Sequence, residues 1–300
     1  MEKRVESIYL DKIMALFPAN IRESINKTGH KYKITQIKIK VGRKILVYIN
    51  GDCIETDYTT TKADIDTIIS RITQYSPVRA VSSFSKGYTS FCGVRIGFLG
   101  EAMEEYSQRT GFKSISGLCI RIPHEVLGCA EGISKAVIKP RGVMNTLIIS
   151  PPGGGKTTLL RDTLRLAGNL FTCAVADERG EICACVDGAP TMDVGKYTDI
   201  LNGFEKGEAL CMAIRNLSPK AIFTDEIGTK DDAKALYNAS TMGVGFVATA
   251  HGNSLEDVLK REGIRFLAEN SLIHYAVILS SIEAPGVIEA VRRITPCGEV

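Results

Sequence analysis

A glycine-rich segment that ends in lysine and threonine is the part of the chain whose residue types point most directly to chemistry. It reads SPPGGGKT over residues 150–157, between an apolar run and a segment of helical character. Glycines let backbone N–H groups turn toward phosphate oxygens, and the N-terminus of the following helix adds partial positive charge. The expected phosphate-binding residues are Pro152, Gly153, Gly154, Gly155, Lys156, Thr157 and Thr158.

Within this loop, Lys156 is expected to contact the β- and γ-phosphates of ATP, and the Thr157 hydroxyl to ligate magnesium. Ser150 stands where the usual pattern has its first glycine, a position that mainly shapes the entry to the loop. A glycine-rich turn without a ligand could share this composition. The apolar strand before the loop and the helix after it favour a Walker A loop that binds Mg-ATP.

Two carboxylates follow a second apolar run, and their position suggests a metal ligand and a general base. The run AIFT occupies residues 221–224 and is followed at once by Asp225 and Glu226. In P-loop ATPases an acidic residue here holds magnesium through water, and an adjacent glutamate can deprotonate the attacking water. We assign Asp225 to the metal and Glu226 to the base, which favours hydrolysis over transfer to another substrate. The alternative is a strand whose final carboxylates are merely solvated.

Polar clusters end two more apolar runs. The chain reads DERGE over residues 177–181 and TAHG over residues 249–252. Ligands bind at the carboxyl ends of parallel strands, so these clusters should face the same nucleotide. The further catalytic candidates are Glu178, Glu181 and His251. Taken alone, the acids and Arg179 could form a surface ion pair, and the histidine could have a structural role.

These side chains require a sheet that brings several strand ends together. Five apolar runs show no alternation with polar residues, which is typical of strands buried on both faces of a parallel sheet. They cover residues 146–150, 172–176, 221–224, 245–249 and 276–280. From residue 145 onward such runs alternate with helical segments, and this order predicts a RecA-like α/β P-loop domain.

The residues before this domain show a different pattern. The expected elements are helices over residues 7–17 and 64–75, a hairpin over 34–49, strands over 88–98 joined at Gly93, and a strand over 117–122. Pro18 ends or restarts the first helix. Together they predict a smaller α+β domain. With a Pro-Arg-Gly punctuation at residues 140–142, the boundary should lie between residues 127 and 142, giving domains 1–135 and 136–300.

Size and composition agree with two domains of a globular protein. The chain has 300 residues, of which 24% are charged and 44% hydrophobic. No segment approaches the roughly 18 uninterrupted apolar residues that a membrane span needs. The charged start leads into an amphipathic stretch rather than a secretory signal, so we expect a cytoplasmic protein.

Charge and cysteine content argue against a dedicated nucleic-acid binder, without excluding one, and against a zinc site. The net charge of +3 is small and scattered, so the electrostatic footprint of a dedicated nucleic-acid binder is missing. Nine cysteines without a signal peptide fit reduced, mostly buried thiols. Cys183 and Cys185 have C-x-C spacing but lack the second pair or nearby histidine of a zinc site. We interpret the cysteines as structural.

The order of Walker A loop, acidic cluster, Walker B strand and histidine cluster resembles the secretion ATPase superfamily, which drives type II and type IV secretion and pilus assembly. The resemblance is clear from Leu147 to Gly252. The preceding region is similar to the nucleotide-covering N-terminal domain of that superfamily. The segments that carry this similarity are GY at 87–88, GVRIG at 93–97 and IRI at 120–122.

Within the superfamily, the chain more closely resembles the stage III sporulation protein AA family. The matching segments are KTTLLRD at 156–162, DERGEI at 177–182, IRNLSP at 214–219 and TDEIG at 224–228. This resemblance implies a cytoplasmic ATPase in the mother cell of an endospore-forming bacterium. It would be associated with the channel that joins mother cell and forespore. Membrane association would come through an integral membrane component of that channel complex, with residues 8–17 as one docking segment.

The resemblance also implies a homo-oligomeric ring, a hexamer, in which each ATP lies between a P-loop domain and arginines of an N-terminal domain. Arg95 and Arg121 are the candidates for the γ-phosphate contact. The alternative for each is a paired surface arginine on a strand. By the same analogy, the acids at 178 and 181 share water positioning with Glu226, and His251 senses the γ-phosphate.

Three other functions stay open from the sequence. A nucleic-acid translocase would share the nucleotide chemistry but needs basic loops and stacking aromatics, and the chain has no tryptophan and dispersed charge. A switch or assembly platform could bind ATP and recruit membrane partners without acting as a motor. A small-molecule kinase is a weaker alternative because no lid or acceptor pocket is evident. The sequence does not identify a transported substrate.

Overall fold

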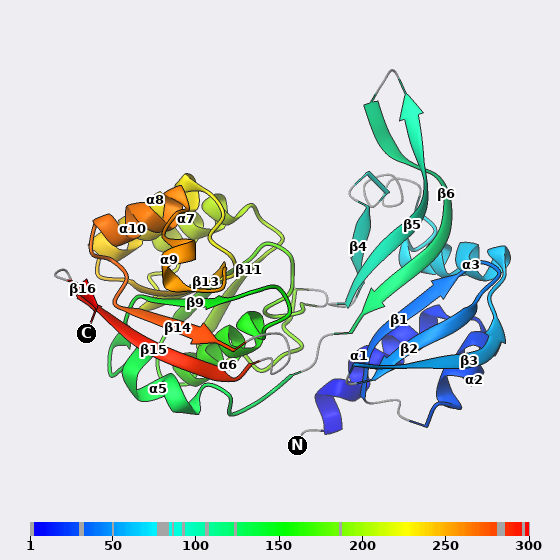
Figure 1. Cartoon of the computed structure of the whole chain (residues 1–300), viewed down its shortest axis with the longest axis horizontal. Coiled ribbons are helices and arrows are strands. Elements are labelled where there is room, and N and C mark those ends of the chain that lie inside the picture. The colour runs from blue at the N-terminus through cyan, green and yellow to red at the C-terminus, as the bar shows by residue number, and fades with distance from the viewer. Residues whose placement is uncertain are drawn as a thin grey trace. The chain divides into compact units, whose positions relative to one another are not determined.

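Two units make up the chain, residues 1–124 and 125–300, and each is built on its own sheet (Figure 1). The computed structural model describes residues 3–29, 33–49, 51–76, 84–85, 87–91, 94–105, 108–122, 125–185, 188–280, 286–295 and 298–299. The α/β architecture is the one predicted from the sequence, a smaller α+β unit followed by a RecA-like P-loop unit.

The first unit contains a six-stranded antiparallel sheet with the order β3-β2-β1-β6-β5-β4. The strands are β1 (Ile34–Lys40), β2 (Lys44–Ile49), β3 (Asp52–Thr59), β4 (Tyr88–Phe91), β5 (Val94–Glu105) and β6 (Gln108–Arg121). The helices are α1 (Lys3–Leu16), α2 (Ala19–Asn26) and α3 (Lys62–Ile72). They lie against one face of the sheet (Figure 1).

Alternation in the sequence decides which face of this sheet the helices cover. Ile37 and Ile39 of β1 are fully buried, whereas Lys40 is exposed. Successive side chains of a strand point to opposite faces, so the isoleucines meet the helices and the lysines face outward. Thr61 and Asp64 form a capping box that begins α3. The expected hairpin over 34–49 and both expected helices are confirmed.

The β5–β6 hairpin is the main departure from the sequence prediction in this unit. The expected strand over 117–122 is the end of a 14-residue strand, which pairs with the 12-residue β5. Three irregularities interrupt the register of the pair, and its outer part extends beyond the other strands of the sheet (Figure 1). Gly93, the expected joint between strands, lies outside the described residues.

The second unit contains an eight-stranded sheet with the order β11-β10-β12-β13-β9-β14-β15-β16. The first six of these strands are parallel, and β15 and β16 are antiparallel. The strands are β9 (Thr146–Ser150), β10 (Cys173–Asp177), β11 (Thr198–Asn202), β12 (Ala221–Thr224), β13 (Gly245–His251), β14 (Tyr275–Leu279), β15 (Ile288–Thr295) and β16 (Gly298–Glu299).

Helices cover both faces of this sheet (Figure 1). They are α5 (Glu131–Val137), α6 (Lys156–Gly168), α7 (Lys206–Asn216), α8 (Lys230–Thr241), α9 (Leu255–Val258) and α10 (Glu262–Glu269). Every residue of β9, β10 and β12 is buried. Leu147 and Ile149 pack in one core cluster with residues of α7, α8 and α10. The five predicted parallel strands are confirmed, two with the expected bounds and three with ends shifted by one or two residues.

Residues 125–143 belong to the second unit, although the sequence places much of this segment in the first domain. The Ala130 N–H donates to the buried Asp162 Oδ2 of α6 at 2.7 Å, and Glu125 Oε1 accepts from the Asp193 N–H at 2.7 Å. Pro140 and Arg141 form the turn between the short strands β7 (Ile138–Lys139) and β8 (Gly142–Val143). The division at 124 therefore comes before the expected boundary at 135.

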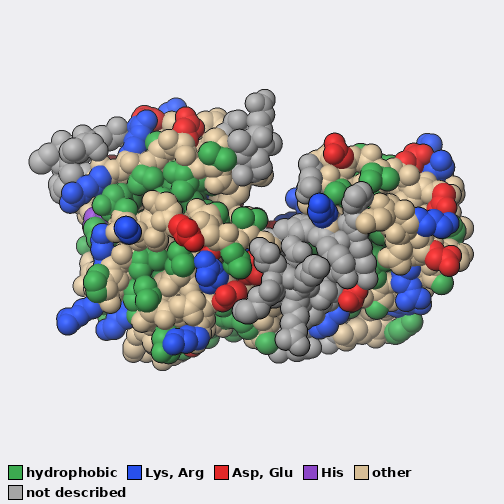
Figure 2. Space-filling view, turned by 90° about the horizontal axis from the view of Figure 1, so that it is seen from below, with side chains coloured by type: hydrophobic (Ala, Val, Ile, Leu, Met, Phe, Trp, Pro, Cys, Tyr) green, Lys and Arg blue, Asp and Glu red, His purple; other side chains and the backbone are tan. Residues whose placement is uncertain are grey.

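Two expectations drawn from composition concern the surface and the membrane. On the face shown in Figure 2, Lys and Arg side chains are interspersed with Asp and Glu and form no continuous basic surface. Among the described residues, no helix combines the length and the apolar character needed to cross a bilayer.

Candidate nucleotide-binding site

Three neighbouring strands of the parallel sheet end where the predicted catalytic residues lie. The order β12-β13-β9 places the Walker B strand and the Walker A strand on either side of β13. His251 at the end of β13 pairs in register with Ser150 at the end of β9. The Gly252 N–H donates to the Ser150 carbonyl at 3.2 Å and joins the two strand ends. The sheet therefore brings the loop, the histidine and the carboxylates to one edge.

The loop between β9 and α6 has a backbone that only glycine accommodates easily. Gly153 and Gly155 have φ angles of 81° and 90°, in the left-handed region that disfavours other residues. A Cβ atom on Gly154 would lie 2.2 Å from the Ser150 Oγ. The loop thus turns tightly into the N-terminus of α6, where the first N–H groups of a helix have no partner within the helix. This is an anion-binding arrangement.

Lys156 begins α6 and folds back over the loop. Its Nζ donates to the Ser150 carbonyl at 2.8 Å and to the Pro151 carbonyl at 2.9 Å. Burial lowers the pKa of Lys156 to about 8, and the Glu226 carboxylate partly opposes this effect. A phosphate would supply the full counter-charge that two carbonyl oxygens do not provide. Ser150, in place of the usual glycine, keeps its hydroxyl inside the loop on the Pro151 carbonyl at 2.8 Å.

Thr157 and Asp225 are suitable protein ligands for the magnesium of a Mg-nucleotide site. Asp225 follows β12, and its buried Oδ1 atom lacks a hydrogen bond of good geometry. Burial raises the pKa of Asp225, and the ammonium of Lys206, 2.9 Å away, opposes that rise. Within the described residues, no cluster of three His, Cys, Asp or Glu could hold a metal. One carboxylate and one hydroxyl suit magnesium that also binds phosphate oxygens and water.

Glu226 lies between two basic side chains of the same unit. Its Oε2 is 3.2 Å from the Nε2 of His251, and its Oε1 is 3.8 Å from a terminal nitrogen of Arg261. Burial lowers the pKa of His251, and the Lys156 charge acts in the same direction. A neutral imidazole can donate one N–H to the carboxylate and orient it without carrying a charge. The carboxylate remains about one-third exposed and can reach a water molecule.

The acidic cluster after β10 contains one structural acid that anchors the others. The fully buried Asp177 carboxylate accepts from the backbone N–H groups of Glu181, Ile182 and Cys183 at 2.9, 3.1 and 2.8 Å. Three hydrogen bonds to its oxygens hold the loop of residues 178–183 in one shape. Burial raises the pKa of Asp177 despite these bonds. Asp177 is therefore the anchor of the loop that carries the candidate acids.

Helix α6 holds the same loop from its other side. The buried Arg161 donates from Nε to the Ile182 carbonyl and from a terminal nitrogen to the Glu181 carbonyl, each at 2.6 Å. Two charges on this loop act on the pKa of the Asp225 carboxyl, which Arg179 lowers and Glu181 raises. Glu178 is exposed on the loop.

Two basic residues of the site were not anticipated from the sequence. Arg261 approaches Glu226 from the start of α10, and Lys206 contacts Asp225 from the start of α7. Both look like ordinary solvated residues at the beginning of polar helical segments. No spacing relative to the P-loop distinguishes them. Their roles become visible only in the fold, where α7 packs beside β12 and the start of α10 brings Arg261 to Glu226.

Arg95 and Arg121 lie in the first unit and pair directly with each other on β5 and β6. Residues directly opposite on antiparallel strands point to the same face of the sheet. The guanidinium of Arg95 lies over the Tyr88 ring, 4.2 Å from its centroid. Arg121 is exposed. The two candidates thus form one basic pair on the sheet face that the helices leave open, and their contact with a nucleotide stays a prediction.

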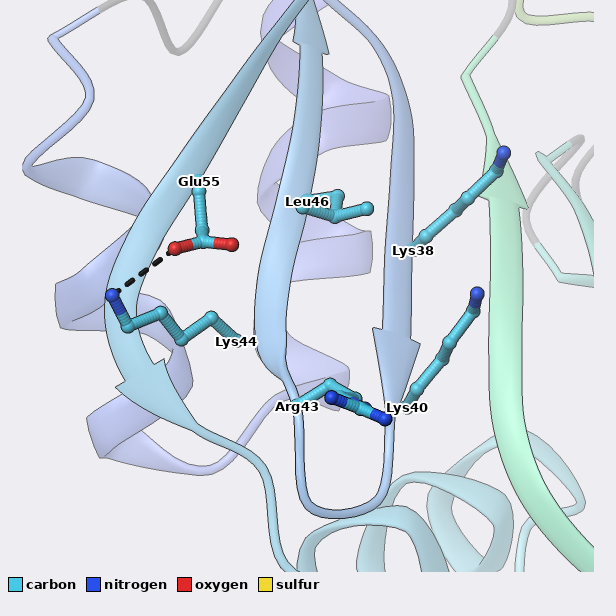
Figure 3. A pocket seen from close by; sticks show the side chains of 6 residues that line it. All are labelled: Lys38, Lys40, Arg43, Lys44, Leu46 and Glu55. Carbon is cyan, nitrogen blue, oxygen red and sulfur yellow. Dashed lines mark hydrogen bonds and ion pairs between the residues drawn. The ribbon is translucent and has the colours of Figure 1, made fainter.

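A second basic cluster lies on the open face of the same sheet. Four basic side chains and one carboxylate line a shallow pocket (Figure 3). The lining residues are Lys38, Lys40, Arg43, Lys44, Leu46 and Glu55. Lys44 pairs with Glu55 at 3.1 Å, and the Lys38 ammonium lies 4.9 Å from the Tyr48 ring centroid. The cluster has no glycine loop or helix N-terminus, so it lacks the features of a triphosphate site.

Comparison with known sequences identifies close relatives of this chain. The model of the family described as "Sporulation stage III, protein AA" matches residues 8–294. Stage III sporulation protein AA of Bacillus subtilis (strain 168) is 31% identical over 291 residues, and the match covers 94% of each chain. The similarity therefore extends over both units and includes every candidate site residue.

Comparison with solved structures supports the fold independently. The ATPase DotB of Legionella pneumophila superimposes with a TM-score of 0.62 at 14% identity, covering 93% of this chain and 82% of that one. The pilus retraction motor PilT with bound ADP gives a TM-score of 0.58 at 14% identity, covering 94% and 80%. These matches confirm the fold predicted from the motif order.

Proposed function

The chain belongs to the stage III sporulation protein AA family, and from this premise we propose that it binds Mg-ATP in the P-loop and hydrolyses it. One observation carries the proposal. Three adjacent strands end in the P-loop, in His251 and in the Asp225–Glu226 pair. A structural role alone gives no reason for a glycine loop, a buried lysine and two carboxylates to share one sheet edge.

In this proposal, Lys156 exchanges its two carbonyl contacts for the β- and γ-phosphates, and the α6 N-terminus holds phosphate oxygens. Thr157 and Asp225 hold magnesium, Asp225 through water. When bound, magnesium neutralises charge on the phosphates and helps to align them. The chain's own contribution is a preformed loop, so little reorganisation is needed when the phosphates arrive.

Glu226 acts as the general base. His251 and Arg261 fix its carboxylate, and a remaining lone pair accepts the proton of the attacking water. The loop anchored by Asp177 and Arg161 carries Glu181 toward the same space, where it helps to position that water. Departure of the γ-phosphate changes the charge beside His251. The histidine, at the end of β13, can therefore respond to whether ATP or ADP is bound.

Arg95 and Arg121 provide the positive charge that the γ-phosphate needs in the transition state. Both belong to the first unit, so ATP would be enclosed only when that unit closes over a P-loop unit. The proposed assembly is a homohexameric ring. Hydrolysis releases the clamp, and the resulting motion of the first unit acts on an integral membrane component of a sporulation channel, on the mother-cell side. The motion energises transport or assembly.

ATP binding and turnover test the nucleotide site. Purified Lys156→Ala should lose ATP binding, because neither the loop nor the helix terminus replaces its charge. Glu226→Gln should still bind ATP but hydrolyse it at least about 100-fold more slowly, as expected for loss of a general base. Lys230→Ala, which removes an exposed lysine at the start of α8, is the matched control. Full activity in Glu226→Gln would exclude Glu226 as the base.

Light scattering tests the ring. Glu226→Gln traps ATP unhydrolysed, so its mass with Mg-ATP should rise from one subunit to about six, since ligand binding stabilises the closed state. In assembled protein, Arg95→Gln and Arg121→Gln should keep ATP binding and lose about 1000-fold in turnover. Arg43→Gln on the same sheet should have no effect. If both arginine variants turn over normally, another residue supplies the charge.

Complementation in sporulating cells distinguishes a motor from an assembly platform. Glu226→Gln should fail to support sporulation if hydrolysis drives the process. If this variant supports sporulation fully while Lys156→Ala does not, ATP binding without turnover is sufficient and the protein is a platform.

A further inference from the structure

Lys206 occupies a position that the stability of its own helix does not explain. It is the first residue of α7, and its side chain is only 9% exposed. A cation at the N-terminus of a helix opposes the helix dipole, and a buried ammonium loses its hydration. Both effects disfavour lysine here. The compensating interaction must therefore come from outside α7.

That interaction is with the Walker B end of β12. The Lys206 ammonium lies 2.9 Å from Asp225 Oδ1 and also donates to the Glu226 carbonyl oxygen. One side chain thus contacts the carboxylate proposed for magnesium and the main chain of the proposed base. Lys230, the first residue of α8, offers a contrast, since it is half exposed and pairs with Glu262 at 2.6 Å outside the site.

The charges around Asp225 show what the ammonium balances. The Asp225 charge raises the pKa of Asp177, the Glu181 charge raises the pKa of Asp225, and the Arg179 charge lowers it. Without Lys206, the charges that act on the buried Asp225 carboxylate would include those of Glu181 and of the exposed Arg179. Such a carboxylate attracts a divalent cation even without nucleotide, because unpaired buried charges interact strongly in a low-dielectric setting.

We propose that Lys206 is a positioning residue of the metal site, which holds the Asp225 carboxylate in place and balances its charge until magnesium arrives with the nucleotide. This inference rests on the proposed function, because it assigns Asp225 to the metal. As a consequence, the site distinguishes a free divalent cation from a cation that arrives bound to ATP. The nucleotide-free site disfavours a bare divalent cation, whereas Mg-ATP brings phosphate oxygens that complete the coordination.

Manganese binding to nucleotide-free protein tests the proposal without any turnover. The probe is Mn²⁺ alone, and electron paramagnetic resonance reports the free ion during titration. Lys206→Met removes the charge with little change in volume, and Lys206→Gln also keeps a donor for the Glu226 carbonyl. Both should bind Mn²⁺ at least about tenfold more tightly than the parent protein. This is a conservative figure for loss of a charge in contact with the carboxylate.

Three controls connect the effect to Asp225. Lys206→Arg retains the charge and should bind Mn²⁺ as weakly as the parent protein. Lys230→Met removes a lysine at the equivalent position of α8 and should also leave Mn²⁺ affinity unchanged. Asp225→Asn combined with Lys206→Met should abolish the gain. Equal Mn²⁺ affinities in the parent, Lys206→Met and Lys206→Gln proteins, within about twofold, would overturn the proposal.

The same variants show whether Lys206 is needed for folding rather than for the metal site. If the single neutral variants fail to give a cooperative melting transition, Asp225→Asn should restore it, since replacing both members of a buried pair removes the uncompensated charge. Double variants that still fail to fold would assign Lys206 to the structure of α7 and overturn the proposal. ATP binding by the parent protein, measured in parallel, separates the two hypotheses. If the parent protein does not bind ATP, the proposed function is contradicted, whatever the Mn²⁺ titrations give.

Discussion

The two sheets of this molecule carry charged residues in opposite ways. In the parallel sheet, every residue of β9, β10 and β12 is buried, and their polar side chains are confined to the strand ends and the loops that follow. In the antiparallel sheet, β1 and β2 alternate between buried and partly exposed residues, so arginines and lysines occupy the strands themselves. Whether helices cover one or both faces of a sheet therefore determines where its charged side chains can lie.

The difference has a consequence for rigidity. The loops of the P-loop unit are anchored by buried polar groups, such as Asp177 and Arg161, that bind backbone N–H and C=O groups. The arginine pair of the first unit lies on an open sheet face, where the register of β5 and β6 pairs the two residues and Arg95 stacks on the Tyr88 ring. The P-loop unit therefore has loops fixed by buried hydrogen bonds, whereas the first unit carries its arginines on an open sheet face.

The largest expected effect is the loss of stability when either of two adjacent core residues of β9 is replaced. Ile148 and Ile149 are both fully buried, on opposite faces of β9. Replacing either with alanine should lower the free energy of unfolding by about 2–5 kcal/mol, because both leave cavities. Hydrogen exchange of peptides from the second unit measures the change locally. If only one of the two variants is destabilised, the sheet is covered on one face, and the contrast with the first unit disappears.

A somewhat smaller effect is expected for the anchor of the acidic loop. Asp177→Ala leaves three buried N–H groups without an acceptor and should destabilise the second unit by about 1–3 kcal/mol. Protection of residues 178–183 against hydrogen exchange should fall most. Asp193→Ala, at an exposed carboxylate of the same unit, serves as the control. Unchanged protection in Asp177→Ala would mean that Arg161 suffices to hold the loop.

Much of the parallel sheet and of the site could be predicted from the sequence for one physical reason. Strands buried on both faces are continuous apolar runs, and the polar residues that end them are the ones that meet a ligand. Edge strands lack this signal. β11 reads TDILN with no buried residue, and β15 pairs at the other side of the sheet, so both were missed.

The remaining departures also have physical causes. The outer part of the β5–β6 hairpin shows no regular alternation, because three irregularities shift its register. Pro140 and Arg141, which suggested a boundary nearby, form a turn within the second compact unit. Lys206 and Arg261 depend on contacts between elements distant in sequence, which no local pattern encodes.

Removing a helix cap should cost about the same stability in the two units, unlike a substitution on their sheets. Thr61 with Asp64 begins α3, and Thr229 with Asp232 begins α8, each through the same reciprocal hydrogen bonds. Thr61→Ala and Thr229→Ala should each destabilise their unit by about 1 kcal/mol, since each removes one acceptor for a helix N–H group. Serine at either position should restore the parent value. A clearly larger loss in one unit would show that its cap also supports tertiary packing.

The smallest expected effect concerns the open face of the first sheet. Lys40 is exposed on β1, directly after the fully buried Ile39. Lys40→Ala should change the free energy of unfolding by less than about 0.5 kcal/mol in isolated subunits, as is usual for surface substitutions. Ile39→Ala, the matched control one residue away, should lose about 2–5 kcal/mol. Hydrogen exchange of peptides from the first unit reports both. If Lys40→Ala becomes destabilising only after Mg-ATP induces assembly, this face is covered in the ring, and the sheet that is open in one chain is closed by another.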